Sequence, residues 1–137
     1  MTATSRWAYS QLDRVRFADL DARGHLNNVA LLTFFEAARI MYLRRRFAEE
    51  DARDLILVSQ HIDYRAPGGL DDDLRTWLRP AEVRTKSFRL EFEIRREDDD
   101  TLVADGHGIY VAYDYASGTS KPLSADMCAK LGEDAAS

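Results

Sequence analysis

The chain has 137 residues, of which 45% are hydrophobic and 31% are charged. This length and composition predict a single domain, placed at residues 1–131, with a loose polar tail at 132–137. The net charge of −5 argues against a nucleic-acid partner, because such a partner requires a basic surface. The one cysteine, Cys128, excludes an internal disulfide and fits a reducing compartment.

The first ten residues, MTATSRWAYS, lack the apolar region of a secretory signal. The longest apolar stretch of the chain is interrupted by Thr33, Glu36 and Arg39, which makes it a poor membrane span. We therefore expect a cytoplasmic protein with no membrane partner.

Val15 and Phe17 alternate with arginines, which predicts a first strand at about residues 12–18. Residues 28–47 are rich in Ala, Leu and Arg and contain no Gly or Pro, so they are predicted to form a long helix. Asn27 or Asn28 can cap its start, and three arginines at residues 44–46 suit the negative end of its dipole. Apolar residues occupy most of the helix circumference, so we expect protein to surround it.

The second half of the chain has the pattern of strands. Residues 56–64 alternate with a period of two and end at RAPGG. Residues 74–83 contain Pro80, which favours an edge strand or a bulge. The segment SFRLEFEIRRE alternates strictly, with its apolar side chains on one face: Phe88, Leu90, Phe92 and Ile94.

A long strand is predicted at residues 101–115, where Gly106 and Gly108 indicate a bend or a closely approaching backbone. A short helix at about 124–131 completes the pattern. The turns between strands are tight, which favours antiparallel pairing. The simplest arrangement is an α+β fold in which a curved sheet wraps around the long helix.

The segment from the first strand into the helix, VRFADLDARGHLNNVALLTFFEAARIMYL, resembles the start of hotdog-fold acyl-CoA thioesterases of the 4-hydroxybenzoyl-CoA thioesterase type. The shared features are Asp-x-x-Gly-x-x-x-Asn before the helix and a Phe-Glu-x-x-Arg element within it. The resemblance covers residues 10–130. It implies a five-stranded antiparallel sheet wrapped around one long central helix, and protomers that pair their sheets into a homodimer or a dimer of dimers.

The resemblance also implies roles for three residues before and at the helix start. Asp21 matches the catalytic carboxylate, Gly24 the small residue that lets substrate approach, and Asn28 the residue whose backbone N–H faces the thioester oxygen. Their chemistry suits thioester hydrolysis. A carboxylate can attack the carbonyl or activate water, and a free N–H at a helix start can stabilise the oxyanion without a metal or cofactor.

Each candidate also has a structural interpretation. Asp21 before a helix is commonly a turn residue, and His25 can be either a base or a loop histidine that binds backbone. Asp19 can raise the pKa of Asp21 if the two approach, or can be a solvated residue. Glu36 is expected to pair with Arg39 and is a structural or supporting residue. No Cys/His spacing indicates a metal site, and no Gly-x-Ser-x-Gly motif is present.

The phosphates of coenzyme A require cations near the groove that holds the pantetheine arm. The resemblance places the candidates on one predicted strand and the residues before it: Arg84, Thr85, Lys86, Ser87 and Arg89. A solvated strand face is the alternative for each of them.

Three functions remain open at this stage. The first is hydrolysis of an acyl-CoA thioester to free acid and CoA, and hydrolysis of an acyl-acyl-carrier-protein is its close variant. The second is a non-catalytic acyl-thioester binding protein, which would not need Asp21 as a carboxylate. A hydratase on the same fold is disfavoured because no paired Asp/His motif is present. Fold alone does not separate these functions.

Overall fold

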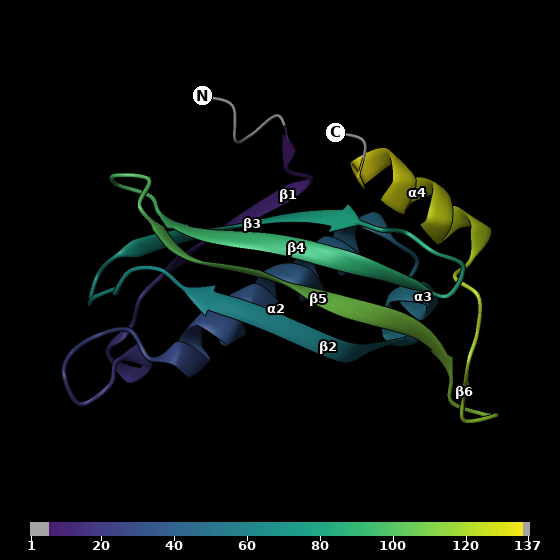
Figure 1. The fold of residues 1–137 in the computed structure, drawn as a ribbon, viewed down its shortest axis with the longest axis horizontal. Coiled ribbons are helices and arrows are strands. Elements are labelled where there is room, and N and C mark those ends of the chain that lie inside the picture. Colours follow the sequence, from purple (N-terminus) through teal and green to yellow (C-terminus); the bar gives the residue numbers. More distant parts are fainter. Residues whose placement is uncertain (1–5, 136–137) are drawn as a thin grey trace.

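A computed structural model describes residues 6–135 of the chain. Its sheet is antiparallel throughout, with the strand order β1-β3-β4-β5-β2 and a short β6 paired to β5. The strands are β1 (Tyr9–Arg14), β2 (Leu55–Tyr64), β3 (Asp73–Ala81), β4 (Ser87–Arg96), β5 (Leu102–Asp114) and β6 (Thr119–Ser120). Strands β1 and β2 form the two edges of the sheet (Figure 1).

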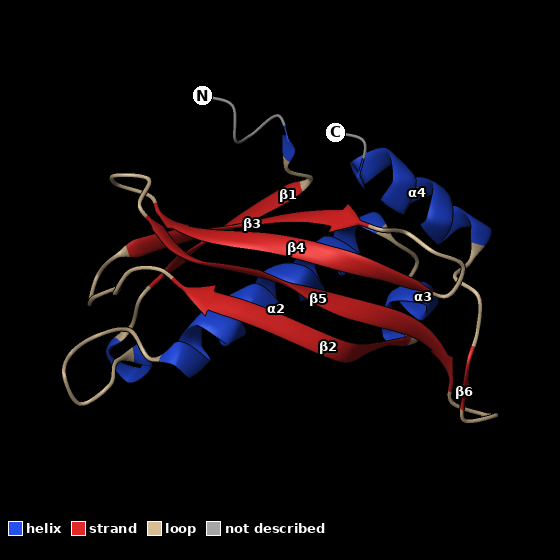
Figure 2. Cartoon of the chain, in the orientation of Figure 1, coloured by secondary structure: helices blue, strands red, loops and turns tan. Residues whose placement is uncertain are grey.

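The long helix α2 (Asn28–Arg46) lies against one face of this curled sheet, as Figure 2 shows. The remaining helical segments are a 3-10 turn (Phe17–Asp19), α3 (Glu49–Arg53) and α4 (Ala125–Ala135). The hotdog arrangement implied by the resemblance, five main antiparallel strands around one long helix, is confirmed. Within residues 6–135, the length and apolar content that a membrane crossing requires are not combined in any helix.

The core lies between α2 and the inner face of the sheet. The predicted alternation in β4 is confirmed, since Phe88, Leu90, Phe92 and Ile94 are all buried. Phe35 of α2 stacks on Phe92 with ring centroids 4.1 Å apart. Burying one large apolar side chain contributes about 1.5–3 kcal/mol, so this row accounts for much of the attraction between helix and sheet.

The helix has the predicted bounds to within one residue, but the expectation that protein surrounds it is wrong for this chain. Val29 and Ile40 on α2 are 66% and 41% exposed. The inner face of β2 is also open, with Leu57 44% exposed. The sheet curls around one side of α2 only, so a strip of α2 and the edge strand β2 are left uncovered together.

The first strand differs from its predicted bounds of 12–18. Strand β1 ends at Arg14, and the chain turns into the 3-10 segment, which leaves Phe17 81% exposed. The carboxylate of Asp19 causes this turn, because it accepts hydrogen bonds from the backbone N–H and the guanidinium of Arg16. A strand through Phe17 would break these bonds.

The C-terminal helix is longer than predicted. It was expected at 124–131 with a loose tail after it, but α4 continues to Ala135. The extra turn is held by Arg46, which pairs with Glu133 at 2.7 Å and with Asp134 at 3.1 Å. Tyr42 also donates to Asp134. The end of the predicted tail, residues 136–137, lies outside the described residues.

The edge strand or bulge predicted from Pro80 is not observed, because β3 lies inside the sheet between β1 and β4. The pairing of β3 with β1 extends only as far as Leu78, so Pro80 stands beyond that partner strand and its missing N–H costs no ladder bond on that side. A Cβ on Gly106 would lie 2.0 Å from the carbonyl oxygen of His61 in β2. The predicted close approach of another backbone at this glycine is therefore confirmed.

Candidate active site

A tight loop at residues 20–27 delivers the chain to the start of α2. Leu20 and Leu26 form an antiparallel bridge, and the N–H of Asp21 donates to the carbonyl of His25 at 2.7 Å. Just outside this bridge, the N–H of Asn27 donates to the carbonyl of Asp19, also at 2.7 Å. These contacts fix the loop on both sides of Asp21.

The Asp21 carboxylate accepts two backbone hydrogen bonds through Oδ1, from the N–H of Arg23 at 2.8 Å and from the N–H of His25 at 3.1 Å. These bonds, the one from His25 first, hold the pKa of the Asp21 carboxyl below its ordinary value, because they favour the charged form. No hydrogen bond within residues 6–135 uses Oδ2. The side chain is thus an oriented, ionised carboxylate with one oxygen available.

Asn27 is the residue that caps α2. Its side-chain oxygen accepts the N–H of Val29 at 2.7 Å, which settles the choice between Asn27 and Asn28. Asn28 is the first helical residue, so its N–H has no acceptor within the helix. Across the described part of the chain, no hydrogen bond takes up this N–H. It stands at the positive end of the helix dipole.

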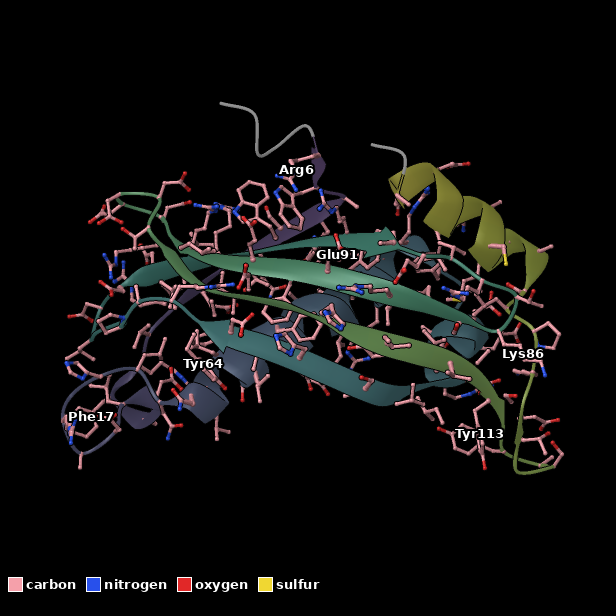
Figure 3. All side chains as sticks on the ribbon, in the orientation of Figure 1. Arg6, Phe17, Tyr64, Lys86, Glu91 and Tyr113 are labelled. Carbon is pink, nitrogen blue, oxygen red and sulfur yellow. The ribbon has the colours of Figure 1, made fainter. Side chains whose placement is uncertain are left out.

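Asp21 and Asn28 line one cavity of about 350 Å³. The opposite wall comes from the end of β2 and the loop after it. The full lining is Asp21, His25, Leu26, Asn28, Leu31, Tyr64, Arg65, Ala66, Pro67 and Gly68. Figure 3 shows Tyr64 at the end of the sheet that faces this loop. A carboxylate and an unpaired amide therefore border the same space.

Gly24 and His25 both have structural roles in the loop. Gly24 has φ of +80°, which glycine adopts without strain, and a Cβ there would meet no atom within 4 Å. Its backbone conformation, rather than crowding, accounts for the glycine. His25 lines the cavity, and its backbone N–H bonds Asp21 while its backbone pairs with Gly69. The backbone-binding role is observed, whereas a role for its ring as a base stays a prediction.

Glu36 pairs with Arg39 at 2.8 Å, as its spacing predicted. It is 53% exposed and is not among the residues that line the Asp21 cavity. Asp19 was considered as a solvated neighbour of Asp21, and this interpretation is wrong. Asp19 is buried, and Arg16 lowers the pKa of its carboxyl chiefly through a side-chain hydrogen bond. Its backbone carbonyl accepts the N–H of Asn27 and so holds the end of the loop.

The basic residues expected at the phosphates of coenzyme A lie far from Asp21 in the same chain. Arg84, Thr85 and Lys86 are exposed in the loop that joins β3 to β4, and Figure 3 shows Lys86 at the opposite end of the sheet from Tyr64. Ser87 begins β4. Arg89 lies on the outer face of the sheet, where Nη2 donates to Nδ1 of His107 at 3.0 Å.

One cation that the sequence analysis missed does line the Asp21 cavity. Arg65 follows β2 and pairs with Asp105 at 2.9 Å and with Asp63 at 3.4 Å. No sequence pattern marks it, because its place depends on the pairing of β2 with β5. Between residues 6 and 135, His, Cys, Asp and Glu side chains do not gather in any group of three or more that could hold a metal ion.

The curled antiparallel sheet around α2, with the loop at the helix start, defines the hotdog class of folds. A model of the thioesterase-like superfamily matches residues 15–131. The chain belongs to this superfamily.

Three proteins illustrate its similarities. The uncharacterized protein YsmA of Bacillus subtilis (strain 168) is 30% identical over 80 residues, which are 57% of this chain and 54% of YsmA. The chain thus matches about half the length of this curated relative. A thioesterase from Thermus thermophilus, solved with coenzyme A and Zn, superimposes with a TM-score of 0.86 at 25% identity and covers 96% of this chain and 97% of that one. YbaW, a probable thioesterase from Escherichia coli, has a TM-score of 0.80 at 28% identity, with 92% and 98% covered.

Proposed function

We propose that this protein is a thioester hydrolase that cleaves an acyl-CoA to the free acid and CoA. The observation that carries the proposal is one cavity lined both by Asp21, whose carboxylate is ionised, and by Asn28, whose helix-start N–H has no acceptor among the described residues. Membership of the thioesterase-like superfamily and a similar structure solved with coenzyme A support it.

In the proposed reaction, the thioester carbonyl oxygen accepts the N–H of Asn28. The carboxylate of Asp21 takes a proton from water as the water oxygen attacks the carbonyl carbon. The N–H and the helix dipole stabilise the negative charge on the carbonyl oxygen. The carbon–sulfur bond then breaks, and the departing thiolate takes the proton from Asp21. One water is consumed, and a carboxylic acid and a thiol are released.

A second route uses the same residues. The free oxygen of Asp21 attacks the carbonyl carbon, CoA leaves, and water hydrolyses the resulting anhydride. The two routes are separated by a single turnover in ¹⁸O water, because only the anhydride route can place ¹⁸O in the Asp21 side chain.

We further propose that the protein acts in the cytoplasm as a homodimer or a dimer of dimers. The uncovered edge of β2 supports this proposal, since an exposed sheet edge with apolar side chains, here Leu57 and Val58, favours pairing. In a single chain, Lys86 lies at the opposite end of the sheet from Tyr64, which lines the Asp21 cavity, so we propose that Arg84 to Arg89 hold CoA at the site of a second protomer.

The experiment is a substrate panel that follows free thiol. Purified protein is given short, long and aromatic acyl-CoA, and in parallel the same acyl groups on acyl-carrier protein. Release of thiol from one class of acyl-CoA is expected. Release only from acyl-carrier protein would change the substrate assignment. Tight binding of acyl-CoA without release of thiol would identify a non-catalytic binding protein instead.

A further inference from the structure

The largest described cavity outside the Asp21 site lies between the C-terminal half of α2 and the short helix α3. Its volume is about 510 Å³, which is within the usual range for small-molecule pockets. Ile40, Leu43 and Ala52 form an apolar floor. The remaining lining residues are charged: Arg39, Arg44, Glu49 and Arg53. The cavity is therefore a hydrophobic surface with a mainly cationic rim.

The excess of positive charge is unusual for a chain whose net charge is −5. Arg39 is paired with Glu36, and Arg53 makes only an exposed pair with Asp54 at 3.3 Å. Arg44 is exposed and takes part in no ion pair among residues 6–135. The guanidinium groups of Arg44 and Arg53 are thus available to a ligand, since an exposed ion pair such as Arg53–Asp54 contributes little free energy and is easily exchanged.

This combination fits a nucleotide better than a protein surface. Guanidinium groups bind phosphate through paired hydrogen bonds, and a planar ring can cover an apolar floor. A concave site suits a small ligand, whereas a protein partner requires a broader contact. We propose that this cavity binds the phosphate-bearing adenosine end of coenzyme A, with Arg44 and Arg53 as the phosphate ligands. The proposal rests on the acyl-CoA thioesterase function proposed above.

The position of the cavity indicates which active site it serves. About 24 Å of helix separates Asn28 from Arg44 at the usual α-helical rise per residue. Strand β2 follows α3 and ends at Tyr64, which lines the Asp21 cavity. If two β2 strands pair antiparallel along their full length about a two-fold axis at the middle of the strand, Leu55 of one chain lies beside the partner's Tyr64. The α2–α3 cavity would then serve the partner's Asp21.

Direct binding of adenosine 3′,5′-bisphosphate tests the cavity without requiring catalysis. Calorimetry is expected to show that R44Q/R53Q binds this probe at least about tenfold more weakly than the wild type, the effect of losing charged hydrogen bonds. R45Q is the matched control. Arg45 is the next residue of the same helix but lies over the ring of Tyr9, outside the cavity, so its loss should leave binding unchanged. Unchanged binding in R44Q/R53Q, with loss in R84Q/K86Q, would overturn the assignment.

Steady-state kinetics then show which part of the substrate the cavity binds. R44Q/R53Q should raise KM for acyl-CoA at least about tenfold with kcat unchanged, and should not affect the same acyl group on pantetheine, which lacks the nucleotide. An equal effect on both substrates would mean that the cavity holds the acyl group, and would overturn the proposal. A wild type that releases no thiol, while its binding of the bisphosphate still depends on Arg44 and Arg53, would contradict the hydrolase function and support the nucleotide site.

Mixed dimers test whether the cavity serves the partner. A mixture of D21N chains and R44Q/R53Q chains should recover a component of activity with the wild-type KM, which neither parent shows, because one of the two sites in each mixed dimer receives both an intact Asp21 and an intact cavity. If the cavity served its own chain, no site would be intact. The absence of recovery after subunit exchange would therefore overturn the assignment across the interface.

Discussion

The backbone N–H of Asn27 donates to the backbone carbonyl of Asp19 at 2.7 Å, and this bond joins the residue that caps α2 to the buried residue that precedes the loop. Both ends of the bond are fixed by further contacts. Asp19 is held by Arg16, and Asn27 is held by the N–H of Val29. As a result, the segment that presents Asp21 is anchored on each side, while Asp21 itself remains exposed at the cavity.

Replacing Asp21 by Asn is expected to lower kcat about 10²-fold or more, the scale for loss of a general base or nucleophile. The amide keeps an oxygen that accepts the backbone N–H groups of Arg23 and His25, so the loop should be retained. Steady-state thiol release measures the effect. The control is D71N, an exposed carboxylate outside the cavity whose positive φ Asn also tolerates. Similar activity in both variants would remove Asp21 from the reaction.

The two adjacent amides at the helix start should differ in their effect on stability. Asn27→Ala removes the cap and is expected to lower the free energy of unfolding by about 0.5–2 kcal/mol. Asn28→Ala should leave it nearly unchanged, because no hydrogen bond of the described residues uses the Asn28 side chain. Urea denaturation of both variants measures this difference. Equal losses would show that the cap is shared between them.

Gly106→Ala should be one of the most damaging single substitutions in the sheet. The added Cβ would lie 2.0 Å from the His61 carbonyl, so β5 and β2 would have to separate locally. We expect the free energy of unfolding to fall by about 3 kcal/mol, the upper end of the usual range for overpacking, because the atom in the way is backbone. Gly132→Ala in α4 is the control. It meets no atom within 4 Å and should gain about 0.5–1 kcal/mol of helix stability. Thermal or urea unfolding would show a lower free energy of unfolding for Gly106→Ala and a higher one for Gly132→Ala.

His107 is expected to make stability depend on pH. Its Nδ1 accepts a hydrogen bond from Arg89, which has no lone pair to offer, so this nitrogen must be unprotonated. Burial first, and then the charges of Arg89 and His61, lower the pKa of the His107 imidazole. Glu91 and Glu82 act in the opposite direction but do not reverse the shift.

Proton linkage gives the direction in which stability changes with pH. Below about pH 6.5 the unfolded chain binds a proton at residue 107 that the folded chain resists, so this contribution to stability is lost as the pH falls from about 6.5 through the lower folded-state pKa. His107→Gln keeps an acceptor for Arg89 and removes the titration. Urea unfolding at about pH 7.5 and about pH 5.5 should show a larger acid loss in the wild type than in H107Q. Parallel losses in the two proteins would contradict this origin.

Much of the fold was predictable because its signals are local. The alternation of Phe88, Leu90, Phe92 and Ile94 identifies a strand with one buried face, since successive side chains of a strand point to opposite sides. Residues 28–46 are rich in Ala, Leu and Arg and contain no Gly or Pro, and this local composition identifies a helix. Asp21 and Asn28 are close in sequence, so their common location at the helix start was also predictable.

The errors lie where side-chain contacts override periodicity. Phe17 belongs to the predicted first strand, but a local contact between Arg16 and Asp19 turns the chain there. The end of α4 was assigned to a tail, but Arg46, 87 positions earlier than Glu133, extends the helix. Periodicity carries no information about such contacts.

The sequence by itself determined the long helix, the antiparallel strands that follow it, the buried face of β4, and the presence of a carboxylate and an amide at the start of the long helix. Only the tertiary structure decided that Arg65 enters the Asp21 cavity and that Lys86 lies at the other end of the sheet. The physical reason is that secondary structure follows from the spacing of neighbouring side chains, whereas a cavity is formed by strands and loops whose pairing joins residues far apart in the chain.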